Sequence, residues 1–131
     1  MPRSGQALVE LALCLPLLLL LGGTAWSAAT LVQAREELDL ACAAAASSAA
    51  RAPDASAAQD AASIAFAQAL SGDPPQTSNL RLDLGAFQRG GVMEAYASAV
   101  WPVGSGLSSL LPLQITLVAS SAAVIEPWRS R

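Results

Sequence analysis

The sequence predicts an α+β fold: a long amino-terminal transmembrane helix that continues into a helical stalk, then a small head of a second helix and a three-stranded antiparallel sheet. Three observations predict it. A 22-residue stretch carries no charge, helical spacing of apolar residues continues beyond it, and strand-like alternation follows residue 80. Apolar residues make up 53% of the 131 and charged residues only 13%. A soluble domain carries about 25% charged residues, so part of this chain is not suited to water.

The uncharged stretch runs from Leu11 to Val32 and would be roughly 33 Å long as a helix, at about 1.5 Å per residue. That length spans a hydrocarbon core of about 30 Å. Pro16 is tolerated in a membrane helix because neighbouring groups can satisfy the carbonyl that it frees. Gly22 and Gly23 offer a flexible point or a point of close helix packing. We therefore predict a membrane span here.

The charges that flank this span predict its orientation. Arg3 is the cation before it, whereas residues 33–131 hold six arginines and nine acidic residues, a net charge of −3. Because the more positive flank of a span stays in the cytoplasm, we expect the amino terminus inside and the remainder of the chain outside.

Two kinds of processing are compatible with such a helix. An ordinary secretory signal would be cleaved near residues 25–29, whereas in the other case the helix is kept and only a short leader is removed. Glu10 separates them, because a carboxylate drawn towards the bilayer centre costs on the order of 2–3 kcal/mol. Either a partner compensates for this charge, or the side chain extends back to the cytoplasmic interface.

The stretch GQALVELAL, which begins at Gly5 and is followed by Pro16 and a leucine run, resembles the amino terminus of TadE-like pseudopilins. These are minor pilins of tight-adherence (Flp) pili and relatives of type IV pilins. The resemblance implies a leader of residues 1–5, removed by a prepilin peptidase between Gly5 and Gln6. Glu10 then becomes the fifth residue of the mature chain, where the family carries its glutamate.

One departure is Leu11, where the family often has an aromatic residue. The resemblance further implies a single-pass protein of the bacterial cytoplasmic membrane, or one incorporated into a pilus. Its expected partners are the lipid bilayer, the prepilin peptidase, other pilin or pseudopilin subunits and an inner-membrane assembly platform. The expected divisions are a leader (1–5), a transmembrane helix (6–32), a helical stalk (33–51) and a head (52–131).

The physical role of Glu10 follows from charge. Cleavage after Gly5 would expose an α-amino group with a reference pKa near 8. Paired with Glu10 of a neighbouring subunit, this amine would offset the cost of holding both charges in low dielectric. Such a pair would also set the axial register between subunits, as a single polar residue does in a coiled coil.

Helical spacing continues into the stalk, with no proline before Pro53. The residues that follow it are Leu31, Arg35, Leu38, Cys42, Ala45 and Ala49. The alanine-rich tract 41–50 either admits another helix at close range or forms an exposed helix surface. Cys14 and Cys42 would lie roughly 42 Å apart on one helix, too far for a disulfide bond within the chain.

The head begins with a helix predicted from Ser56 to Leu70. Ser56 and Gln59 have the spacing of a capping box. The expected buried face consists of Ala58, Ala62, Phe66, Ala69 and Leu70.

Alternating residues then predict three strands. The first strand covers 80–86, and its inward residues are Leu80, Leu82, Leu84 and Ala86. The second covers 92–101, and the residues on one face are Met93, Ala95, Ala97, Ala99 and Trp101. The third covers 113–125, and its inward residues are Leu113, Ile115, Leu117, Ala119 and Ala123. A turn at 88–91 and a Gly/Ser/Pro-rich connection at 102–112 join them into an antiparallel meander.

Composition excludes several function classes. The chain has no histidine, which excludes a Ser-His-Asp triad, a Cys-His pair and a histidine-ligated metal. Its net charge of −3 argues against direct nucleic-acid binding. We expect no catalytic residue, cofactor, metal or small-molecule substrate. The leading hypothesis is a structural pseudopilin in pilus assembly. The alternative is an α+β binding module of the cell envelope, secreted or membrane-anchored, with an ordinary signal peptide or anchor.

Overall fold

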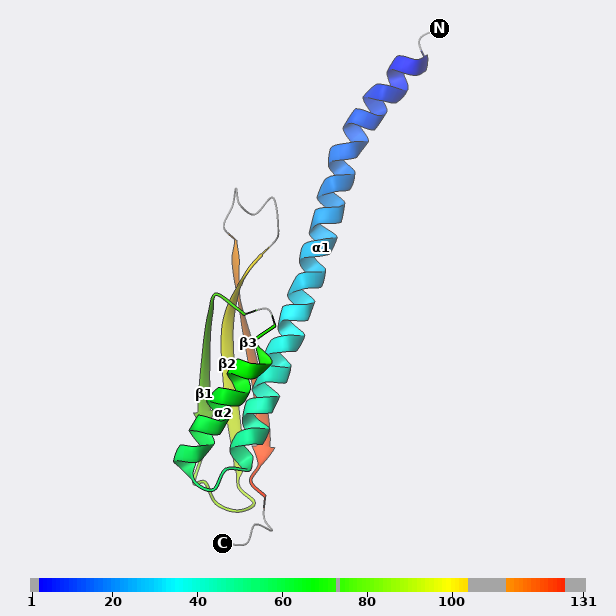
Figure 1. The fold of residues 1–131 in the computed structure, drawn as a ribbon. Coiled ribbons are helices and arrows are strands. Elements are labelled where there is room, and N and C mark those ends of the chain that lie inside the picture. The colour runs from blue at the N-terminus through cyan, green and yellow to red at the C-terminus, as the bar shows by residue number, and fades with distance from the viewer. Residues whose placement is uncertain (1–2, 73, 104–112, 127–131) are drawn as a thin grey trace.

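The computed structural model describes residues 3–72, 74–103 and 113–126 and has the predicted α+β architecture (Figure 1). The elements in chain order are α1 (Arg3–Ala50), α2 (Ala55–Ala69), β1 (Thr77–Asp83), β2 (Val92–Pro102) and β3 (Gln114–Val124). Helix α2 and the sheet gather around the carboxyl-terminal part of α1, and the amino-terminal part of α1 projects away from them. The described part of the chain is therefore a head on a long helix.

Helix α1 is continuous over 48 residues, with Pro16 inside it, which corresponds to about 72 Å at about 1.5 Å per residue. It ends just before Pro53, because a residue that precedes proline is disfavoured in helical conformation. Cys14 is exposed and Cys42 is buried, and both are free thiols, as the prediction of one continuous helix requires.

The two parts of α1 differ in burial. From Gly5 to Gln33 its residues are exposed, apart from the partly exposed Ser27 and Leu31, whereas one face is buried from Ala34 onwards. The buried residues of that face are Ala34, Leu38, Ala41, Cys42, Ala45, Ala46, Ala49 and Ala50. Most of the predicted stripe is confirmed, but Arg35 is not part of it. Its guanidinium stays exposed and pairs with Asp39 one turn later, with 3.5 Å between Nε and Oδ2.

The sheet is the predicted antiparallel meander, in the order β1-β2-β3. Central strand β2 pairs with both neighbours, so that Ala97 lies between Leu80 of β1 and Ala119 of β3. The inward face of β2 is buried as predicted, from Met93 to Trp101. On β3, Ala119 is buried and Ile115, Leu117 and Ala123 are partly buried, whereas Leu113 is exposed and precedes the strand. Residues 104–112 of the predicted connection lie outside the described residues.

Alanines make the contact between α1 and the sheet. Helix α1 packs against β2, β3 and α2, and its buried alanines face a layer in which Ala95, Ala97, Ala99 and Ala119 are also buried. Side chains this small let the backbones approach closely. The alanine tract therefore meets both a helix and a sheet, and the alternative of an exposed helix surface is wrong. Cys42 lies in the same contact, where its thiol donates a hydrogen bond to the Ala95 carbonyl (Sγ···O 3.3 Å) and desolvation by burial raises its pKa.

Strand β1 begins and ends three residues earlier than predicted, at Thr77 and Asp83 instead of 80 and 86. Its first residues are polar and exposed, so no apolar alternation marks them. The strand ends where the Asp83 carboxylate accepts a hydrogen bond from the Gly85 amide (3.1 Å) and Gly85 adopts a positive φ of 51°. Leu80, Leu82 and Leu84 are partly buried as expected, but Ala86 is exposed beyond the strand.

The capping box predicted at the start of α2 is wrong. The helix begins at Ala55, and Asp54 is its N-cap, with Oδ1 accepting from the Ala57 amide at 2.8 Å. Ser56 instead donates its hydroxyl to the same carboxylate oxygen (2.7 Å). A carboxylate is a strong cap because it is charged and faces the helix amino terminus. The buried face is otherwise as predicted, except that Ala69 is exposed.

We expect Asp54→Ala to lower the Tm of the detergent-solubilised chain at about pH 7, with the exposed Asp60→Ala as the control. Hydrogen bonds from the Ala57 amide and the Ser56 hydroxyl lower the pKa of Asp54 below its usual value of 3.8. A lowered folded-state pKa stabilises the fold above the unfolded-state pKa, and this stabilisation disappears as pH falls through the folded-state pKa. The Tm difference should therefore shrink below about pH 4; a difference that persists unchanged to about pH 2 would contradict this role.

Candidate functional site

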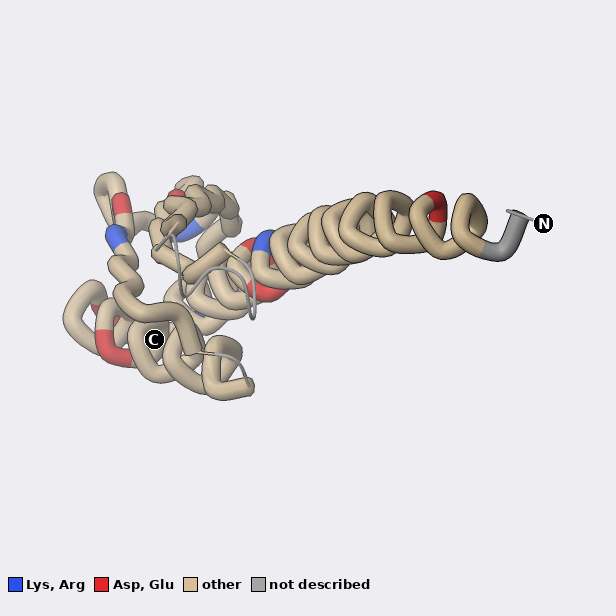
Figure 2. Tube along the Cα trace, turned by 90° about the horizontal axis from the view of Figure 1, so that it is seen from above, with Lys and Arg blue, Asp and Glu red and all other residues tan. Residues whose placement is uncertain are grey.

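The exposed amino-terminal part of α1 is the principal candidate for a functional surface in the described chain. Its most apolar 18-residue window has a mean hydropathy of 2.1 and is 0% buried, and the helix is long and apolar enough to cross a membrane. Figure 2 shows this part as a long stretch without charge, between one acidic residue near the amino terminus and a cluster of charges further along. So large an exposed apolar surface indicates a lipid or protein partner.

Gly5, Gln6 and Glu10 lie in the first turns of α1, so the structure brings the predicted processing and pairing residues together. The Gln6 side-chain amide donates to Glu10 Oε1 at 3.4 Å, across one helical turn. Both side chains are exposed, and among the side chains that the structure describes Glu10 has a neutral donor and no cationic partner. The carboxylate is thus accessible to a cation from another molecule.

Gly22 and Gly23 lie about two turns beyond Pro16 on the same helix. A Cβ atom added to either glycine would meet nothing within 4 Å, so neither packs against another part of its own chain. Absent side chains here leave the backbone open to close approach by another helix. The structure places these three residues in the exposed region but shows no contact that assigns them a packing role.

The polar side chains of this region are satisfied within the helix. The hydroxyls of Thr24, Ser27 and Thr30 each donate to a backbone carbonyl one turn earlier, at 2.9 Å. Such internal hydrogen bonds remove the need for water around a hydroxyl. The stretch from Leu11 to Val32 is therefore compatible with a hydrocarbon environment along its whole length.

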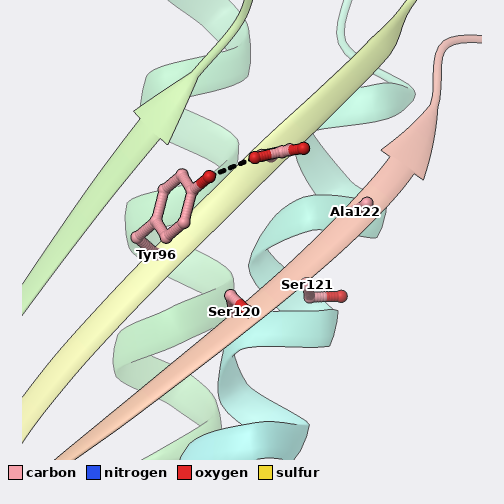
Figure 3. Close-up of a pocket in the computed structure, with 5 residues that line it drawn as sticks. Tyr96, Ser120, Ser121 and Ala122 are labelled. Atoms are coloured by element: carbon pink, nitrogen blue, oxygen red, sulfur yellow. Dashed lines mark hydrogen bonds between the residues drawn. The ribbon is translucent and has the colours of Figure 1, made fainter.

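A second feature is a small hollow of about 140 Å³ on the outer face of the sheet, lined by Glu94, Tyr96, Ser120, Ser121 and Ala122. Figure 3 shows the Tyr96 hydroxyl turned towards the Glu94 carboxylate, to which it donates a hydrogen bond. This bond raises the pKa of Tyr96, because the carboxylate stabilises the protonated phenol. The carboxylate is occupied by the phenol, and the lining includes no histidine to activate a serine, so the hollow has no arrangement for nucleophilic catalysis.

Comparison with protein families finds a match for the first of these two features. Residues 5–51 match the model of the family described as TadE-like protein. Over this segment the chain is similar to TadE-like proteins. The match covers the exposed part of α1 from Gly5 onwards and all of its buried part, and it ends one residue beyond the helix. Comparisons with curated proteins and with solved structures gave no match.

The TadE-like family is a structural, pilus-associated family, and its segment in this chain is the helix that can span a membrane. Both findings fit a membrane-anchored, pilus-related protein. The resemblance inferred from Gly5, Glu10 and Pro16 is thereby confirmed at the level of the family.

Sequence reasoning missed one part of the TadE-like segment's role. The buried face of α1 supplies the head with much of its core, including Leu38 and Cys42, which are fully buried in the same core as Met93 of β2. The i, i+4 spacing of these apolar residues was visible in the sequence, but nothing in it identified the sheet as their partner. The segment therefore joins the exposed surface of α1 to the head through one continuous helix.

Proposed function

We propose that this chain is a pseudopilin of a tight-adherence (Flp-type) pilus, anchored in the bacterial cytoplasmic membrane by α1, with a structural rather than a catalytic role. The observation that carries the proposal is one continuous helix, similar to TadE-like proteins, that runs from an exposed apolar half into the core of a folded head. Near its start lies Glu10, which has no cationic partner among the described side chains. In this arrangement the amino terminus faces the cytoplasm and the head lies outside.

Processing by a prepilin peptidase after Gly5 is the first step of this role. The bond between Gly5 and Gln6 lies in the first turn of α1, so this turn must open before a protease can accept it as an extended substrate. Glycine makes opening easier, since it costs a helix about 1 kcal/mol relative to alanine. Cleavage places a new α-amino group on Gln6, four residues before Glu10.

Pairing between that amine and Glu10 of a neighbouring subunit is the second step. Each group alone is costly in low dielectric, and together they neutralise each other. The exposed apolar face around Gly22 and Gly23 would then pack against other pilin or pseudopilin subunits, or against the inner-membrane assembly platform. Pro16 gives the helix a point at which its curvature can adjust to such neighbours.

Fractionation of cells that produce the chain with a carboxyl-terminal tag tests the anchor. The proposal expects the tagged chain in the membrane fraction, resistant to extraction by carbonate and released by detergent. The alternative, a binding module released after signal-peptide cleavage, expects soluble material in the periplasm or medium. A membrane anchor without an assembly role would tolerate substitutions of Gly5 and Glu10 without loss of function.

A further inference from the structure

The hairpin of β2 and β3 is uncharged over a long stretch and points along α1 towards its amino-terminal half. From Ala95 to Ile125 the sequence contains no acidic or basic residue. Figure 1 shows both strands running beside α1. The end of the hairpin where β2 ends and β3 begins is directed towards the exposed part of that helix. Pro102 and Val103 lie on one side of this end and Leu113 on the other.

The height of this end along α1 follows from one contact. The Cys42 thiol meets the Ala95 carbonyl at 3.3 Å, so these two residues lie level with each other. Val103 lies eight strand residues further, about 26 Å at about 3.3 Å per residue. That length equals about 17 helix residues at about 1.5 Å each, counted back along α1 from Cys42. The strands are inclined to α1 in Figure 1, so the number of helix residues is somewhat smaller. Val103 is therefore level with the region around Ser27, inside the uncharged stretch of α1.

The charges of α1 indicate that the membrane edge lies closer to the head than Val103 does. The exposed pair of Arg35 and Asp39 marks where the helix enters water, and Val32 is the last residue of the uncharged stretch. By the same arithmetic, Arg35 is level with about Ser98, three strand residues beyond Ala95. The hairpin beyond this level accompanies α1 into the depth that the bilayer occupies.

We propose that the end of the hairpin where β2 ends and β3 begins, formed by Pro102, Val103, Leu113 and Gln114, lies in the outer leaflet of the bilayer that α1 spans. The proposal rests on the membrane anchoring proposed above. The end suits this environment: Leu113 is 59% exposed, and the Val103 amide already donates to the Leu113 carbonyl at 2.8 Å. The one polar side chain of this end, Gln114, donates its amide to Gln76 Oε1 at 3.0 Å. Paired polar groups and apolar side chains can enter the outer leaflet without losing all their hydrogen-bonding partners.

The partner is the lipid itself, and no particular headgroup charge is required. The hairpin has no arginine or lysine between Ala95 and Ile125 with which to select anionic lipids. The second contact fixes the head against the membrane surface. It thereby restricts the tilt and rotation of α1, which a single span leaves free.

Depth-dependent quenching of a fluorophore tests this contact in the full chain, reconstituted at low protein density in phosphatidylcholine vesicles. Single cysteines at Val103→Cys and Leu113→Cys are labelled with the environment-sensitive dye NBD in a Cys14→Ala background, where the buried Cys42 does not compete. Ala122→Cys is the matched control, because it is exposed on the same hairpin at the opposite end of β3. Leu20→Cys reports on the anchor itself.

We expect NBD at positions 103 and 113 to be quenched by nitroxide-labelled lipid and to be reduced by aqueous dithionite at least several-fold more slowly than at position 122. The inference is overturned if positions 103 and 113 are quenched no more than position 122 while position 20 is quenched. That result would leave the anchor intact. Protection from dithionite without quenching by lipid also overturns it, because protein would then cover the hairpin end. Absence of quenching at position 20 contradicts the anchor on which the inference rests.

Discussion

Glu10→Ala is expected to abolish assembly of the chain with its pilin-type partners and to leave its membrane insertion intact. Loss of one partner from a pair held in low dielectric costs about 3–5 kcal/mol. That loss corresponds to a reduction of roughly a hundredfold or more in subunit association. Insertion should not suffer, since removal of a carboxylate from the start of the span lowers the cost of entering the bilayer.

Chemical cross-linking in intact membranes, followed by recovery of sheared surface fibres, measures both outcomes. Glu36→Ala is the matched control, because Glu36 is an exposed glutamate of the same helix beyond the uncharged stretch. Glu10→Gln keeps the side-chain shape without the charge and should fail as Glu10→Ala does. If Glu10→Ala forms cross-linked assemblies at the level of the parent chain, the carboxylate has no part in subunit pairing.

Leu38→Ala is expected to have the largest effect on stability. Leu38 is 0% exposed in the contact between α1 and the sheet, and it is among the largest fully buried side chains. Truncation of a fully buried leucine removes its apolar contacts and leaves a cavity, at a cost of about 2–5 kcal/mol. Because a small domain is stable by only about 5–15 kcal/mol, this change removes a large share of the head's stability.

Leu40→Ala is the matched control, two residues away on the same helix and 69% exposed. Its effect should stay within about 0.5 kcal/mol, as for most surface substitutions. Denaturant unfolding of the detergent-solubilised chain, followed by near-ultraviolet circular dichroism, compares the two variants. Equal losses for Leu38→Ala and Leu40→Ala would contradict the packing of α1 against the sheet.

The elements of the head with strong periodic patterns were predictable from the sequence. Strand β2 alternates between apolar residues and Glu94, Tyr96 and Ser98 from Met93 to Ala99, and its inward face is buried as that pattern indicates. The predicted range of β1 was three residues too late, because Thr77 and Ser78 are polar and give no apolar alternation. At α2, Asp54 and Ser56 are both good caps, and only the geometry of the Ala57 amide distinguishes them.

The contact between α1 and the sheet was not predictable for a related reason. Alanine is small and apolar, so a tract such as residues 41–50 fits a helix partner, a sheet partner or an exposed surface equally well. For the segment of residues 5–51, the stretch that begins at Gly5, with Glu10, Pro16 and the leucine run, carried the resemblance to the family whose model matches. The partner of Glu10 belongs to another molecule in our proposal, so neither the sequence nor the fold of one chain contains it.

Mass spectrometry of the intact protein extracted from membranes tests the central claim most directly, because it reads both ends of the processed chain in one measurement. We predict a mature chain that begins at Gln6 and retains all of α1 that follows. A chain that begins near Ala28 would show that the helix was a discarded signal, and a chain in assembled fibres that still begins at Met1 would show that no amine is created for Glu10.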